Sequence, residues 1–123
     1  MDSVRVNNAP KRIWADRTTP SSFTPGNPKG VRVEYMVALA NTTGADRWFN
    51  MPFDADPGYY ENFATHVRDH LDPKLKSYVE FSNEVWNDAL QQGKAATQRG
   101  REFIPTSIRS WRTISIIPTA FGK

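Results

Sequence analysis

The strongest constraint on the fold is a strand, helix, strand order in the middle of the chain. Residues 47–51 (Arg-Trp-Phe-Asn-Met) are aromatic and are closed by Pro52, which predicts a short buried strand. Asp56 as N-cap and Pro57 at the first helical position then predict a helix. Its apolar face consists of Tyr60, Phe63, Ala64, Val67 and Leu71. Asp72-Pro73 ends this helix, and the alternating residues from Ser77 predict a second strand.

Further elements extend this pattern in both directions. Val33, Met36, Val37 and Ala40 recur at helical spacing before Gly44, and residues 89–99 predict another helix. Residues 4–6 and 13–15 are apolar enough to predict short extended segments. Alternating strands and helices are typical of an α/β fold with a parallel sheet and right-handed crossovers, in which reactive side chains lie at the carboxyl ends of the strands.

The run Tyr78-Val79-Glu80-Phe81-Ser82-Asn83-Glu84-Val85-Trp86-Asn87 places a carboxylic acid beside an amide at such a strand end. A half-buried acid that keeps its proton, next to an amide that holds a sugar hydroxyl, suits cleavage of a glycosidic bond. Neighbouring residues on a regular strand point to opposite faces, so Asn83 and Glu84 share one pocket only if the backbone twists or bulges there. The run therefore predicts carbohydrate chemistry.

Composition excludes several other classes. The 123 residues include no cysteine, so thiolate metal sites and cysteine nucleophiles are impossible, and no cofactor is expected. No apolar stretch approaches the roughly 18 residues of a membrane span, and residues 1–5 do not resemble a secretory signal. The net charge of +3 comes from the basic residues 91–123, where Arg109 and Arg112 flank Trp111. Without a nucleic-acid-binding motif, this charge predicts no specific nucleic-acid partner.

Several motifs together carry a resemblance to a known family. They are Met1-Asp2, Asn7-Asn8-Ala9-Pro10, Trp14-Ala15-Asp16-Arg17, Gly30-Val31-Arg32-Val33-Glu34, the segment 40–49 (Ala-Asn-Thr-Thr-Gly-Ala-Asp-Arg-Trp-Phe) and the run 78–87. The chain resembles the retaining glycoside hydrolases of the (β/α)8-barrel clan, and within it a bacterial group of predicted glycosidases or cellulose-binding-like proteins. The resemblance covers about residues 1–92, and the last motif is its most specific part.

The resemblance implies both a fold and a site. The fold is a partial (β/α)8 TIM barrel of about three βα units, around strands 2 to 4, over residues 1–100, with residues 101–123 as a divergent basic tail. Glu84 is implied as the general acid/base and Asn83 as the ligand of the hydroxyl next to the reacting carbon. The same resemblance makes Glu80 an interior carboxylate. The cleft mouth would be lined by Trp48, Asn50, Trp86 and Asn87.

Departures from the family pattern limit this prediction. Ser3, Arg32, Arg47 and Phe53 replace residues expected there, and a complete barrel needs roughly 250 residues. A retaining enzyme also needs a second carboxylate about 5 Å from the first, whereas Glu102 is the only acidic residue after Asp88. We therefore expect a truncated gene product that is inactive alone, with open sheet edges prone to self-association.

Other interpretations stay open at this stage. Glu84 can instead be a carboxylate that favours a helix N-terminus, Glu80 can pair with an arginine, and Trp14, Trp48 and Trp86 can be packing residues. His66 and His70 have zinc-like spacing but no accompanying motif, so a solvated helix face is expected. The alternative functions are a non-catalytic carbohydrate-binding module and a basic interaction protein. The sequence predicts no particular localisation.

Overall fold

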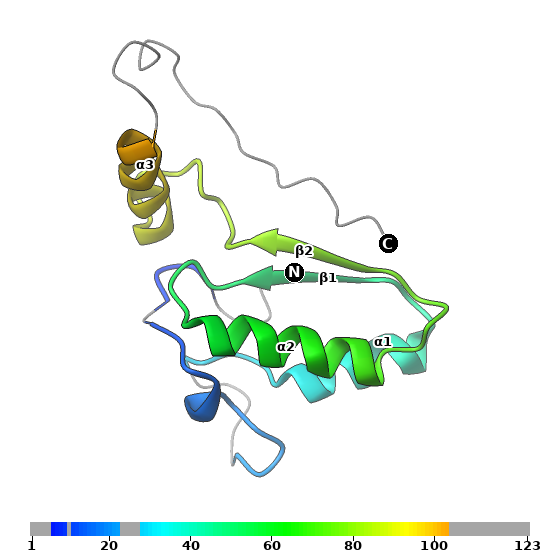
Figure 1. Ribbon diagram of the computed structural model, residues 1–123. Helices are drawn as coiled ribbons and strands as arrows, with labels where there is room; N and C mark the ends of the chain where they lie inside the picture. Colours follow the sequence, from blue (N-terminus) through cyan, green and yellow to red (C-terminus); the bar gives the residue numbers. More distant parts are fainter. Residues whose placement is uncertain (1–5, 10, 23–27, 104–123) are drawn as a thin grey trace.

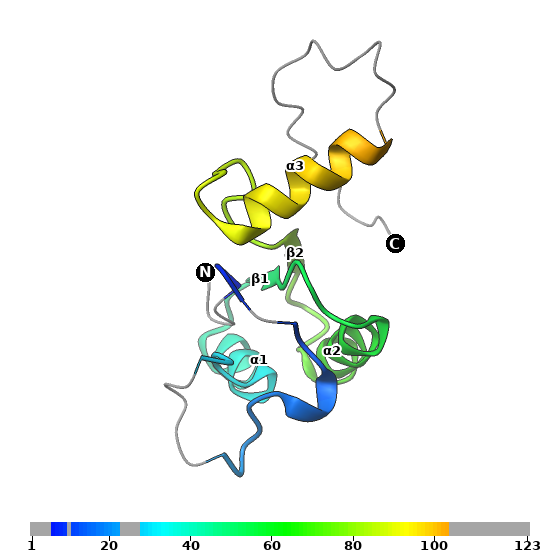
Figure 2. The ribbon, with the colours of Figure 1, turned by 90° about the vertical axis from the view of Figure 1, so that its left-hand side faces the viewer.

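The computed structural model describes residues 6–9, 11–22 and 28–103, which form a small α/β fold (Figure 1). Its elements are the 3-10 helix η1 (Trp14–Asp16), α1 (Val33–Thr43), β1 (Arg47–Met51), α2 (Pro57–His70), β2 (Ser77–Phe81) and α3 (Gln91–Phe103). The two strands are parallel and in register, with Trp48 opposite Tyr78 and Asn50 opposite Glu80. Helices α1 and α2 lie together on one side of the sheet, and α3 lies past the carboxyl ends of the strands, away from both helices (Figures 1 and 2).

The prediction of a partial TIM barrel with three βα units is wrong. The described residues contain a two-stranded sheet, with a single β–α–β crossover through α2. We expected an extended segment at residues 13–15, but residues 14–16 form η1, and the neighbouring Arg12 forms an isolated β-bridge with Ala55. Of residues 4–6, only Val6 is described, and it is buried without belonging to a strand. Three consecutive apolar residues at the end of a helix or in a loop have the same sequence pattern as a short strand. This explains why short extended segments were expected at residues 4–6 and 13–15.

The central crossover follows the sequence prediction closely. Helix α2 begins at Pro57, and the Asp56 Oδ1 accepts a hydrogen bond of 2.7 Å from the Tyr59 backbone N–H. The helix ends at His70, just before the Asp72-Pro73 pair. Its buried side chains are Tyr59, Phe63 and Val67, whereas Ala64 is exposed. The apolar face is therefore rotated slightly from the predicted one.

Helix α1 is also confirmed. Its buried side chains are the four predicted from their spacing: Val33, Met36, Val37 and Ala40. Gly44 ends the helix with a left-handed φ of 64°, and its N–H donates to the Ala40 carbonyl. A residue with a Cβ is disfavoured in this conformation, so Gly44 is an effective stop.

The hydrophobic core lies between the sheet and these two helices. Phe49 and Met51 point from β1 toward α1 and α2, and the Phe49 ring meets Phe63 edge-on at 5.3 Å. Val6 and Tyr59 complete the same cluster. Within the described part of the chain, no helix has both the length and the apolar character that crossing a bilayer requires.

Replacing Asp56 by alanine should destabilise the fold by about 1 kcal/mol, because the Tyr59 N–H loses its cap at the start of the crossover helix. Urea unfolding followed by circular dichroism measures this change. Glu61→Ala removes an exposed carboxylate from the same helix and should change stability by less than about 0.5 kcal/mol. Equal effects of the two substitutions would contradict a capping role for Asp56.

Candidate functional site on the open face of the sheet

An aromatic pair lies on the sheet face that α1 and α2 leave uncovered. Side chains alternate along a strand, so Trp48 and Asn50 point away from the core that Phe49 and Met51 enter. Trp48 and its register partner Tyr78 are 50% and 41% exposed. Their rings stack with centroids 5.7 Å apart and planes inclined by 21°. The result is a broad aromatic surface open to solvent.

Glu80 joins this aromatic surface to a buried amide. Its Oε2 accepts hydrogen bonds from Trp48 Nε1 at 2.9 Å and from Asn50 Nδ2 at 2.8 Å. The same Asn50 nitrogen donates to the Ser82 carbonyl at 2.9 Å, and Asn50 is only 2% exposed. Among the described residues, Glu80 therefore pairs with Trp48 and Asn50 and not with an arginine. Glu80 instead fixes the orientation of the Trp48 ring.

The backbone leaves regular strand geometry directly after Phe81. Ser82 and Glu84 have φ angles of 58° and 50°, a left-handed conformation that non-glycine residues rarely adopt. Asn83 and Glu84 can share a pocket only if regular strand geometry breaks near them, and this break is present. The buried Ser82 hydroxyl also has no hydrogen-bond partner within the described residues. Such strain and an unsatisfied polar group are typical of functional segments.

A buried glutamine holds this strained segment in place. Gln92, at the start of α3, is fully buried, and its Nε2 donates to the Asn83 carbonyl at 2.9 Å and to Asn7 Oδ1 at 2.6 Å. Its Oε1 accepts the Asn8 N–H at 3.0 Å. Asn83 Nδ2 also donates to Asn7 Oδ1 at 3.2 Å. One side chain therefore connects α3, the loop after β2 and the segment around residues 7 and 8.

Sequence reasoning missed Gln92, because a single glutamine at a helix start gives no periodic or motif signal. Asn7 and Asn8 were noticed only as part of the family resemblance. All four positions (7, 8, 83 and 92) carry amide side chains, which satisfy one another readily when buried, but they lie far apart in the sequence. Which of these amides meet could be decided only by the fold.

The remaining predicted site residues lie on the loop between β2 and α3. Glu84 is exposed, and its carboxylate has no hydrogen bond or ion pair within the part of the chain that is described. Trp86 is 69% exposed, and Asn87 Oδ1 accepts the Ala89 N–H at 3.0 Å. The structure thus groups Trp48 and Asn50 with Glu80, and Asn83 with Gln92. Among the described residues, no hydrogen bond or ring contact joins Glu84, Trp86 or Asn87 to either group.

Trp14 has a packing role. Its ring meets Tyr59 edge-on at 5.8 Å, and the Arg17 guanidinium lies 4.0 Å from its ring centroid. Arg17 in turn forms an ion pair of 2.5 Å with Glu34. Of the three tryptophans considered as sugar platforms, Trp14 is therefore the one that belongs to the edge of the core.

The His66 and His70 rings stack on α2 with centroids 4.2 Å apart. Burial, and then the neighbouring His70, lower the pKa of His66. No group of three or more metal-ligating side chains occurs among the described residues.

The junction between the loop and α3 depends on Gly93. A Cβ at this position would lie 2.1 Å from the Asn87 carbonyl oxygen, whereas nothing lies within 4 Å of a Cβ at Gly100 on the same helix. Gly93→Ala should therefore destabilise the protein by about 1–3 kcal/mol, because the loop backbone must move. Gly100→Ala should stabilise α3 by about 0.5–1 kcal/mol. Chemical unfolding of both variants tests this, and a neutral Gly93→Ala would show that the loop does not pack on α3.

Comparison with known proteins assigns no family or function to this chain. No family model, no curated protein and no solved structure matches the chain. The functional reading of the site therefore depends on its own residues.

Proposed function

We propose that the protein binds carbohydrate through the open face of its sheet, without cleaving it there. The observation that carries this proposal is the solvent-exposed stack of Trp48 on Tyr78. Aromatic rings offer a flat apolar surface at low entropic cost, and a pyranose ring presents a matching face of C–H groups. Trp48 is also held rigid by its hydrogen bond to Glu80, so little conformational freedom is lost on binding.

The polar groups beside the stack suit sugar hydroxyls. Only Oε2 of Glu80 is used in the hydrogen bonds to Trp48 and Asn50, and Oε1 has no partner within the described residues. A carboxylate oxygen accepts a strong, charge-assisted hydrogen bond from a hydroxyl. A binding face that combines an aromatic platform with a fixed acceptor supports recognition of a neutral sugar chain.

Hydrolysis is less well supported by this face. Cleavage with retention needs two carboxyl groups about 5 Å apart, one acting as acid and one as nucleophile. The Glu80 side chain is fixed within the sheet, and Glu84 lies on the loop beyond the strand end. Binding needs only the stacked rings of Trp48 and Tyr78 and the Glu80 acceptor. Hydrolysis needs a second carboxyl group near the first as well.

Trp48→Ala should weaken binding of neutral oligosaccharides at least about tenfold, equivalent to about 1.4 kcal/mol. Isothermal titration calorimetry with a panel of oligosaccharides measures this effect. Glu84→Gln should leave affinity unchanged, because no interaction among the described residues joins Glu84 to the open face. Tyr35→Ala removes an aromatic residue with the same 50% exposure from α1 and serves as the matched control. Unchanged binding by Trp48→Ala would rule out the aromatic platform.

A second candidate function is glycoside hydrolysis with Glu84 as the acid/base. The observation that favours it is the left-handed φ of 50° at Glu84, since non-glycine residues are held in this conformation mainly at functional sites. Asn83 precedes it and is anchored by Gln92. This arrangement presents a carboxylic acid on a fixed loop, next to the amide expected to hold a sugar hydroxyl.

For this candidate, Glu84→Gln should lower turnover of aryl glycosides by at least about a hundredfold, as loss of a general acid does. Glu61→Gln, an exposed carboxylate on α2, should leave turnover unchanged. Release of the aryl group is followed by absorbance. Absence of turnover in the unaltered protein would exclude catalysis while leaving the binding proposal intact.

A further inference from the structure

The open face of the sheet is negatively charged within the two described strands. The charged residues of β1 and β2 are Arg47 and Glu80. Arg47 lies on the helix side of the sheet, where its guanidinium carbon is 5.9 Å from the centroid of the Phe49 ring. Glu80 lies on the open face, where it accepts the hydrogen bond from Trp48. The aromatic stack therefore shares its face with a carboxylate and not with a cation from the same strands.

The charged residues at the amino ends of the strands do not reverse this sign. Asp46 and Lys76 directly precede β1 and β2, and the Lys76 backbone N–H donates to Asp46 Oδ1 at 2.8 Å. Both residues are exposed, and their charges are opposite. Opposite exposed charges at neighbouring positions largely cancel and are screened by salt, so they add little potential to the face.

The carboxylate lies close enough to the stack for one ligand to contact both. Trp48 Nε1 donates to Glu80 Oε2 at 2.9 Å, which places the carboxylate at the edge of the indole ring. Glu80 is only partly buried, and its Oε1 has no partner within the described residues. The electron-rich face of an aromatic ring attracts cations, and so does a carboxylate. Both groups therefore favour a ligand that carries a positive charge.

We infer that this face selects amino sugars, with the sugar ring on the stack of Trp48 and Tyr78 and the ammonium group at Glu80. The inference rests on the proposed function and names the class of sugar that is bound. An ammonium group has three N–H donors and a positive charge, whereas a sugar hydroxyl has one donor and no charge. Hydrogen bonds between charged partners are stronger than those to a neutral group. Neutral sugars keep the contact with the rings, and an ammonium group adds the contact with the charge.

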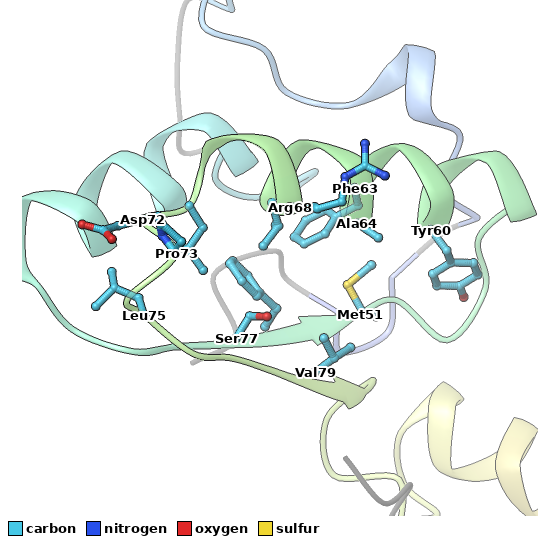
Figure 3. A pocket seen from close by; sticks show the side chains of 13 residues that line it. Met51, Tyr60, Phe63, Ala64, Arg68, Asp72, Pro73, Leu75, Ser77 and Val79 are labelled. Carbon is cyan, nitrogen blue, oxygen red and sulfur yellow. The ribbon is translucent and has the colours of Figure 1, made fainter. Parts of the chain in front are cut away.

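A groove on the other side of the sheet, between α2 and β2, has a different character. Its volume is about 530 Å³, and Figure 3 shows Met51 and Val79 coming to it from the strands and Ala64 from α2. Most of the described side chains that line it are apolar, and the charged ones, Arg68 and Asp72, have opposite signs. A hydroxyl-rich cation would lose water there without gaining equivalent hydrogen bonds. The open face is therefore the better site for an amino sugar.

Isothermal titration calorimetry with the full chain tests this selectivity. The ligands are oligomers of glucose, glucosamine and N-acetylglucosamine with the same linkage and length, at a mildly acidic pH at which only the free amine is charged. The glucosamine oligomer should bind at least about threefold more tightly than either neutral oligomer, because an exposed ion pair and a cation–π contact each add modestly to affinity. Raising the ionic strength from about 0.1 M to about 1 M shortens the Debye length from about 10 Å to about 3 Å and should remove most of this advantage.

Glu80→Gln removes the charge and keeps the shape of the side chain. It should abolish the preference for glucosamine and leave binding of the two neutral oligomers nearly unchanged. Glu61→Gln, which removes an exposed carboxylate from α2, is the matched control and should keep the preference. Circular dichroism verifies that both variants are folded. Equal weakening of all three oligomers by Glu80→Gln would show that Glu80 acts only by orienting Trp48, and would overturn the inference.

The outcomes separate this inference from the proposed function. Equal binding of the three oligomers, or tighter binding of a neutral one, would overturn the inference and leave carbohydrate binding by the open face intact. Absence of binding to every oligosaccharide tested would overturn both. A lysine peptide of the same charge should bind more weakly than the glucosamine oligomer, because it has no sugar ring to cover the stack. Equally tight binding of this peptide would assign the face to cationic peptides and overturn the inference.

Discussion

The packing of one side of β1 against the two helices determines most of this structure. Phe49 and Met51 are buried beneath α1 and α2, and Phe49 meets Phe63 edge-on. Because strand side chains alternate, burying these two residues turns Trp48 and Asn50 to the opposite face. The parallel register then sets Tyr78 and Glu80 beside them. A shift of β1 by one residue would bury Trp48 and abolish both the core and the open aromatic surface.

A second constraint acts at the carboxyl end of the sheet. The strained backbone at Ser82 and Glu84 persists because Gln92 holds the Asn83 carbonyl from α3 and also holds Asn7 from the other end of the chain. Gly93 lets α3 approach the Asn87 carbonyl closely enough for these bonds. Buried polar networks of this kind are costly when incomplete and rigid when satisfied. The loop that carries Glu84 is therefore positioned by an amide network and not by hydrophobic burial.

The outer edge of β2 shows where the observed fold differs from the expected barrel. A barrel strand would have neighbours on both sides, whereas the described sheet ends at β2 and leaves Val79 and the groove beside α2 uncovered. Helix α3 contributes none of the residues that line this groove, and it lies past the carboxyl ends of the strands (Figure 1).

The ends of helices α1 and α2 could be predicted from local sequence. Gly44 ends α1 and Asp56-Pro57 starts α2, since caps and stops act through the backbone of a few adjacent residues. The sequence also indicated that Asn50 and Asn83 lie near the carboxyl ends of strands. Tertiary structure alone decided that Ile13 precedes a 3-10 helix, that the described strands form a two-stranded sheet, and that Glu80 bonds Trp48 while Gln92 bonds Asn83. These outcomes depend on contacts between residues up to 85 positions apart, which local propensity and spacing do not encode.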